Sequence, residues 1–286
     1  MSVPDLRERS NKTARYVWSA IGVGFTLLCI LLAAGALLAI LGYVTVQGIS
    51  SVNWAFVTEL PRPVGVTGGG VANGIVGSII IVGIATVIAV PIGVLTGVYL
   101  ALFGRGVLAE SLRLFSDVLA GLPSIAIGLF AYTLFVAPFK QFSAFSASIA
   151  FAVIMLPLII RTSEEAIRGV PRTVREAGFA LGLSRYATTM KIVVPAARGA
   201  ILTAILLGIA RVTGETAPLL FTAFGSQFWE INPFHPMAEL SLQVFTYAIS
   251  PYDDWHRQAW AGALLLTIAV FIINLLARFA LSFSKR

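Results

Sequence analysis

Two residues of opposite charge stand four positions apart inside an apolar stretch of the chain. Arg211 and Glu215 belong to the segment Arg-Val-Thr-Gly-Glu-Thr-Ala-Pro, within a run long enough to cross a bilayer. A charged side chain at the centre of a membrane helix costs about 2.5–3.5 kcal/mol on insertion scales, so such residues are rare. Residues four apart share one helix face, so the two could form a structural ion pair, or Arg211 could lie on a substrate pathway. The pattern alone leaves both interpretations open.

An anion is the substrate that an arginine on such a pathway would suit. A guanidinium stays charged and offers several N–H donors in one plane to an oxyanion. Glu215 could hold Arg211 in the resting state and so weaken its hold on the anion. The hydroxyl of Thr213 could add a donor, although a threonine within a span commonly bonds its own helix backbone.

The other reactive side chains do not form a catalytic or metal-binding pattern. The two histidines, His235 and His256, have no recognisable ligand spacing, and the single cysteine, Cys29, lies in an apolar run. The chain contains no Gly-x4-Gly-Lys-Ser/Thr sequence, so ATP and its magnesium ion would be used by a partner subunit. We therefore expect no catalytic residue, no metal and no cofactor in this chain.

The elements that position these residues are expected to be membrane helices. Hydrophobic residues make up 58% of the 286 residues and charged residues 12%, against about 25% charged in a soluble domain. A soluble core could not bury so much apolar surface, whereas a bilayer accepts it. The first apolar run is about twice as long as the core of a signal peptide, which predicts an uncleaved helix. The six expected spans are Val17–Val46, Val71–Phe103, Phe115–Ala137, Ala144–Ile160, Gly199–Phe224 and Ala259–Phe283.

Basic residues are distributed unevenly between the segments that join these spans. With the N-terminus in the cytoplasm, sixteen Lys and Arg residues fall on the cytoplasmic side and three on the external side. This asymmetry predicts that both termini are cytoplasmic. The net charge of +7 is therefore a topology signal and gives no separate support for nucleic-acid binding.

The cytoplasmic segment of residues 161–198 is patterned as short helices. Ser163, followed by two glutamates, is typical of a helix start. A second helix is expected from Arg172 to Leu181, ending at Gly182. Ser184 can begin a third, which Pro195 would end.

This segment also carries a spaced motif. The pattern Glu-Ala-Gly-x3-Gly-x9-Ile-x-Val-Pro resembles the EAA loop of ABC-importer permeases, with Gly178 and Val194 as mild departures. The resemblance implies an EAA loop over residues 163–195 whose helices dock on an ATP-hydrolysing subunit. The residues that carry it are Glu176, Ala177, Gly178, Gly182, Ile192 and Pro195.

From about Val71 onward the chain resembles one branch of that family, the PstA-type permeases of bacterial phosphate importers. The likeness rests on Arg211–Ala223, Gln227–Trp229 and Ser250–Gly262. It implies a type I importer fold with six transmembrane helices, and phosphate passage near Arg211 and near Arg161, the basic residue after the fourth span. It also divides the chain into residues 1–70, with the tail, first helix and an external segment, and a permease domain of residues 71–283.

The same resemblance implies partners and a location. These are a PstC-type paralogous permease, two copies of a PstB-type ATPase, a PstS-type phosphate-binding protein and the lipid of the bacterial cytoplasmic membrane.

Three alternatives to a phosphate importer remain. An importer of sulfate or molybdate would share the EAA loop, a membrane enzyme acting on lipid phosphates would need a catalytic cluster, and a channel would not need an ATPase-coupling loop.

Overall fold

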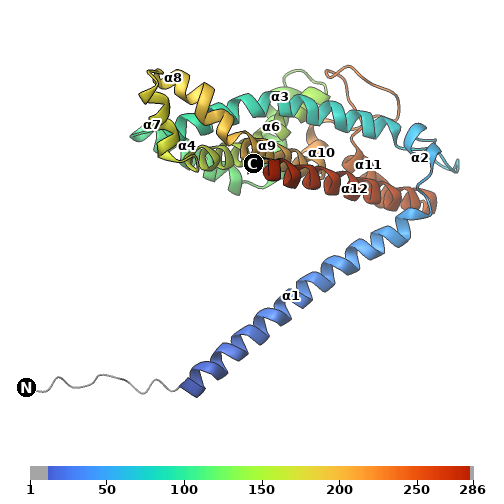
Figure 1. Cartoon of the computed structure of the whole chain (residues 1–286). Helices are drawn as coiled ribbons and strands as arrows, with labels where there is room; N and C mark the ends of the chain where they lie inside the picture. Colours follow the sequence, from blue (N-terminus) through green and yellow to red (C-terminus); the bar gives the residue numbers. More distant parts are fainter. Residues whose placement is uncertain (1–11, 284–286) are drawn as a thin grey trace, which may run out of the picture. The chain divides into compact units, whose positions relative to one another are not determined.

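The computed structural model describes residues 12–283, which form helices joined by turns and contain no β-strand (Figure 1). In this part of the chain five helices are long and apolar enough to span a membrane, and a bent pair of shorter helices passes the same test together. The all-helical membrane fold is therefore confirmed. The long helices are α1 (Lys12–Ile49), α3 (Ala72–Leu102), α6 (Ala144–Arg168), α9 (Val194–Thr213) and α12 (Asp253–Phe283).

The chain divides into two units between Gln47 and Gly48. The described part of the first unit is helix α1, whose side chains from Arg15 onward are nearly all exposed although most are apolar. A helix that is apolar on every side suits lipid contact. The expected first span, Val17–Val46, lies within it.

In the second unit, α3 and α6 run in the same direction and pack closely. A Cβ atom on Gly93 would lie 2.6 Å from Ile159, and one on Gly97 would lie 2.7 Å from Ser163. The two backbones therefore approach as only glycine allows, which is how small residues stabilise pairs of membrane helices. Because the contacts advance together along both helices, the C-terminal ends of α3 and α6 lie at the same end of the bundle.

Helix α9 runs in the opposite direction to α6. Ile201, in its first half, packs in one cluster with Ile167 near the end of α6. Gly208, near the other end of α9, lies beside Met155 and Ile159 in the middle of α6. The start of α9 therefore lies beside the end of α6.

Helix α12 returns beside α9, where Thr203 donates a hydrogen bond to the carbonyl oxygen of Ala277 (3.2 Å). One end of the unit thus collects the C-terminal ends of α3, α6 and α12. We call it the basic end, because it carries Arg105, Arg168, Arg172, Arg175, Arg185 and Arg198. Helices α7 (Arg172–Ala180) and α8 (Arg185–Thr188) lie there, and α2 (Trp54–Thr58) and α11 (Leu240–Ala248) lie at the opposite end (Figure 1).

The expected third span, Phe115–Ala137, is wrong as a continuous helix. It consists of α4 (Val107–Gly121) and a second helix made of α5 (Ser124–Ala131) and the π-helical stretch Tyr132–Val136, and the two helices are bent by 105°. Pro123 lies at the break, and the residue before a proline is driven to extended backbone, as Leu122 is with ψ 137°. The chain leaves α3 at the basic end and enters α6 at the opposite end, so the bent pair is one broken crossing.

The expected fifth span, Gly199–Phe224, is wrong at both ends. The observed helix is continuous from Arg185 to Thr213. It ends at Gly214, and beyond it Pro218 precedes only one short turn, α10 (Leu219–Thr222). Here the helix ends at Gly214, four residues before Pro218, whereas Pro123 lies directly at the break between α4 and α5, and α3 continues through its own proline, Pro91.

Pro195 does not end a helix, contrary to expectation. A π-helical stretch, Thr189–Val193, precedes it, and Pro195 lies in the first turn of α9. The π-stretch shifts the hydrogen-bond register just before a residue that has no N–H to donate. The helix therefore continues where a regular α-helix would be interrupted.

The other expected cytoplasmic helices are confirmed except for the first. Ser163 begins no helix, because α6 continues through it to Arg168. Helix α7 ends at Ala180, and Gly182, just after its C-cap, has the expected left-handed conformation with φ +78°. The Ser184 hydroxyl accepts a hydrogen bond from the backbone N–H of Ala187 at 3.2 Å and so caps α8.

Candidate functional site

Arg211 and Glu215 do not form the ion pair that their spacing suggests. Helix α9 ends at Thr213, so Glu215 lies beyond it, with its backbone N–H bonded to the carbonyl of Val212 at 3.1 Å. Neither side chain forms an ion pair or hydrogen bond with any residue between 15 and 279. Arg211 is exposed on the surface of this single subunit. The expectation that Arg211 and Glu215 share one helix face is therefore wrong, because the helix ends at Gly214 and does not reach Glu215.

Thr213 is buried, and its hydroxyl donates to the carbonyl oxygen of Ile209 at 2.8 Å. Its one proton is thus used within its own helix. Thr213 can still accept a hydrogen bond at this position, but it does not offer a donor to a passing anion.

Arg161 is held by a carboxylate of the broken crossing. Its Nε donates to Asp117 Oδ1 at 3.0 Å, and its Nη2 donates a second bond to Asp117 Oδ2. Such a two-point pair fixes the plane of the guanidinium as well as its position. Its Nη1 also lies 3.7 Å from Glu164 Oε2 on the next turn of α6.

Glu164 lies at the centre of this charged cluster, and only 2% of the residue is exposed. Its Oε1 lies 2.9 Å from Arg113 Nε and 2.7 Å from Arg168 Nη2. Arg113 also donates to the carbonyl of Leu100 at 3.0 Å. The cluster therefore joins α3, α4 and α6 near the basic end. In the sequence, the helical spacing of Arg161, Glu164 and Arg168 indicated this cluster. The expected helix start at Ser163 placed Arg161 outside the helix of the other two, so the spacing was not used.

The two arginines of the expected pathway lie at different depths in the bundle. Gly208 of α9 lies beside Met155 and Ile159 of α6. Arg211 is one turn further from the basic end, and Arg161 is nearer to it. At 1.5 Å per residue the two Cα atoms are separated by about 10 Å along the bundle. They are two successive charged points rather than one site.

The loop that follows Arg211 is positioned by two other elements. The backbone of Pro218 lies against Gly128 of α5, where a Cβ atom would be 2.5 Å from Pro218 Cα. Ser241 of α11 has its hydroxyl 3.0 Å from the carbonyl oxygen of Glu215. The loop after Arg211 therefore packs against α5 of the broken crossing and is bonded to α11.

Glu239 was not among the expected site residues, yet it organises this region. It is fully buried and caps α11 by accepting bonds from the backbone N–H groups of Ser241 (2.7 Å) and Leu242 (3.0 Å). The Ser78 hydroxyl of α3 donates to its other oxygen at 2.9 Å. Burial raises the pKa of Glu239 to about 7, although these hydrogen bonds act in the opposite direction. Glu239 thus connects α3, α11 and, through Ser241, the loop at Glu215.

The residues of the EAA-like motif form a compact hairpin of α7 and α8. The Gly182 N–H bonds the Phe179 carbonyl (2.9 Å) and the Leu183 N–H bonds the Gly178 carbonyl (3.2 Å), which is the Schellman ending of a helix. Gly178 is buried, and a Cβ atom there would lie 2.9 Å from Ile192. The spacing of the motif thus brings Gly178 and Ile192 together. Glu176, Ala177, Gly182 and Pro195 are exposed, as are the apolar residues Phe179, Leu181 and Tyr186.

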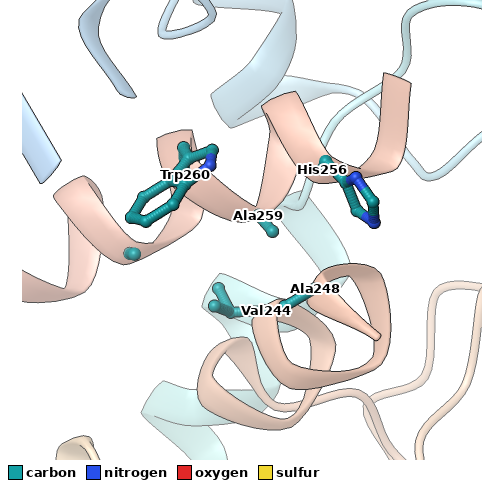
Figure 2. Close-up of a pocket in the computed structure, with 6 residues that line it drawn as sticks. Val244, Ala248, His256, Ala259 and Trp260 are labelled. Atoms are coloured by element: carbon teal, nitrogen blue, oxygen red, sulfur yellow. The ribbon is translucent and has the colours of Figure 1, made fainter. Parts of the chain in front are cut away.

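A groove of about 310 Å³ lies between α11 and α12, and Figure 2 shows its lining. It is mostly apolar, and the Nε2 atom of its one histidine, His256, lies 2.6 Å from the carbonyl oxygen of Ser250. None of the described residues that line it is an arginine, a lysine or an acid, so the lining offers little to an anion. Its lining is Val244, Ala248, His256, Ala259, Trp260 and Ala263.

Solved structures support the fold of the permease part. The chain is similar to a chain in inward-facing structures of the MetNI methionine ABC transporter, with a TM-score of 0.64 and 17% identity. The match covers 76% of this chain and 96% of that one. At this level of identity the likeness concerns the fold alone, which is that of type I ABC importer permeases.

Sequence comparison identifies the family. Residues 89–286 match the model of the binding-protein-dependent transport system inner membrane component. The chain is 44% identical to the phosphate transport system permease protein PstA of Yersinia pestis, over 81% of this chain and 79% of that protein. It is 38% identical to PstA of Haemophilus influenzae, over 94% and 97%. The chain therefore belongs to the family of binding-protein-dependent transport system inner membrane components and, within it, to the PstA-type permeases.

Proposed function

We propose that this chain is the permease subunit of an ATP-driven importer that carries inorganic phosphate across the bacterial cytoplasmic membrane. The observation that carries the proposal is that two guanidinium groups lie at two depths of an apolar bundle. Arg211 has no partner between residues 15 and 279, and Arg161 is held by Asp117. The names of the curated relatives favour phosphate over sulfate or molybdate. The chain itself performs no covalent chemistry in this proposal.

Phosphate meets Arg211 first, because Arg211 lies further from the basic end. Its five N–H donors have no competing acceptor within the described side chains, so they can bind the phosphate oxygens. The anion then reaches Arg161, where Asp117 already occupies two donors. Asp117 and Glu164 also repel phosphate, so this second contact is brief. A weak second site favours release over trapping.

The pathway is completed by a second permease of the PstC type. Arg211 is exposed on this single subunit, and an exposed charge within an apolar span calls for another protein or a water-filled path beside it. A PstS-type protein delivers phosphate at the end that carries α2 and α11. Both termini lie in the cytoplasm.

Transport is driven through the hairpin of α7 and α8. Phe179, Leu181 and Tyr186 present an exposed apolar surface there, and such a surface suits a partner groove. We assign it to a PstB-type ATPase, with two copies per complex, one for each permease. These subunits bind and hydrolyse ATP with magnesium, so this chain needs no cofactor of its own.

Uptake of labelled phosphate by vesicles containing the assembled complex tests the proposal. Arg211→Gln should abolish uptake while the complex still assembles, and Arg211→Lys should retain partial uptake at most, because it keeps the charge but loses the planar donors. Arg198→Gln, at an exposed arginine of the basic end, is the matched control. Normal uptake by Arg211→Gln, or equal competition by excess sulfate and excess phosphate, would contradict the assignment.

A further inference from the structure

A polar cavity at the basic end is not used by the proposed pathway. It has a volume of about 930 Å³ and lies between the turn after α3, the start of α7 and helix α8. Its lining includes five arginines, and Glu176 is the one acidic residue among the described residues that line it. The arginines are Arg105, Arg168, Arg172, Arg175 and Arg185.

Four of these guanidinium groups are not neutralised by the residues that the structure describes. Arg168 is paired with Glu164 at 2.7 Å. Arg105, Arg172, Arg175 and Arg185 form no ion pair or side-chain hydrogen bond with the residues between 15 and 279. They come from three separate segments that the fold brings to one concave surface. Like charges so placed repel one another unless an anion lies between them.

The start of α7 adds to the positive electrostatic potential that the arginines create in the cavity. Gly169, Val170 and Pro171 line the cavity just before the helix, and the N-cap residue, Pro171, provides no side-chain cap. The free backbone N–H groups of a helix start favour an anion, and phosphate groups are commonly bound there. The helix start and the four arginines are independent features that favour the same kind of ligand.

We propose that this cavity binds a phosphate group on the cytoplasmic side of the membrane. Guanidinium groups bind phosphate through paired N–H donors, and the cavity is large enough for a free phosphate ion or the headgroup of an anionic phospholipid. Either ligand would join the end of α3 to the hairpin of α7 and α8. The site is distinct from Arg211 and Arg161, neither of which lines the cavity.

Arginine footprinting with phenylglyoxal on the unmodified full chain tests the site without a substitution. The chain is placed in phosphatidylcholine nanodiscs, and inorganic phosphate is the probe. Phosphate should slow modification of Arg172 and Arg185 about tenfold and leave Arg198, an exposed arginine that does not line the cavity, unchanged. Nanodiscs that contain phosphatidylglycerol distinguish the two sources of the phosphate group. Protection by this lipid without added phosphate assigns the site to a headgroup, and protection by inorganic phosphate alone assigns it to the free ion.

Equilibrium binding of labelled phosphate or phosphatidylglycerol to purified variants provides the second measurement. The double variant Arg172→Gln with Arg175→Gln should weaken the arginine-dependent component about tenfold or more, whereas Arg198→Gln should change it less than twofold. Equal effects of the two would overturn the proposal. A second outcome would also overturn it: neither phosphate nor phosphatidylglycerol protects Arg172, and protection appears only when the ATPase subunit is added. The cavity would then be a protein-docking surface.

Discussion

At the scale of single residues, Glu164 shows how a buried charge is retained in this bundle. Its carboxylate is almost fully buried, and Arg113, Arg161 and Arg168 approach it from two helices. Its Oε2 receives no hydrogen bond from any residue that the structure describes. The cluster therefore depends on the summed attraction of three guanidinium groups rather than on complete hydrogen bonding.

Replacing this carboxylate should destabilise the fold. Glu164→Gln leaves three arginines without their central acid. Loss of one partner in a fully buried pair typically costs about 3–5 kcal/mol. We expect a smaller loss, because the arginines are partly exposed. Glu165→Gln, at the exposed neighbour, is the matched control. Equal unfolding midpoints for the two variants in detergent would contradict a structural role for the cluster.

Glu239 should make stability depend on pH. Its pKa is raised from 4.5 to about 7 by burial, so the folded state binds the proton more tightly than the unfolded state does. The stabilising contribution of the proton is therefore complete below pH 4.5 and is lost as the pH rises through about 7. Unfolding midpoints measured across this interval should fall with rising pH in the unmodified chain and fall less in Glu239→Gln. The same slope in both would remove Glu239 as the cause.

At the scale of elements, the hairpin of α7 and α8 depends on the backbone of Gly182. Its φ of +78° is unfavourable for residues with a side chain, although a Cβ atom there would meet nothing within 4 Å. The cost of a substitution is thus backbone strain, about 1–2 kcal/mol for an ordinary residue, and not a steric clash. Asparagine tolerates this conformation better than a β-branched residue does.

Gly182→Val should therefore impair coupling, and Gly182→Asn should largely preserve it. We expect the valine variant to insert and assemble but to lose phosphate uptake and the stimulation of ATP hydrolysis by the binding protein. Both rates are measured on the reconstituted complex. If the valine variant responds to the binding protein as the unmodified complex does, the hairpin does not transmit the signal.

At the scale of the whole molecule, the second unit has one basic end and one end with few basic residues. The C-terminal ends of α3 and α6 share the basic end, so α6 begins at the opposite end. The bent pair that joins α3 to α6 must therefore cross the whole length of the bundle. Reporter fusions after Arg105 and Arg175 should therefore report cytoplasm, and fusions near Lys140 and Pro236 should report the outside. A cytoplasmic signal at Lys140 would make the bent pair a re-entrant loop instead of a crossing.

The expected domain boundary at residue 70 stays a prediction, and the family match begins at residue 89.

The sequence by itself determined the features that depend on local properties. Hydropathy gave the membrane helices, because transfer into lipid depends on each segment's own side chains. The helix end at Gly182 and the cap at Ser184 followed from the backbone and side-chain chemistry of single residues. The spacing of the loop from Glu176 to Pro195 indicated the permease family before any contact was known.

Tertiary structure decided what depends on residues far apart in the chain. Ser78 and Glu239 are separated by 161 positions, and Arg113 and Glu164 by 51. No periodicity in the sequence predicts these contacts. Proline is the clearest case, since Pro91 lies within a continuous helix and Pro123 lies at a bend of 105°. A helix continues through proline only where neighbouring groups satisfy the freed hydrogen bonds, and a charge is retained in the bundle only where neighbouring groups oppose it. Packing alone brings those groups together.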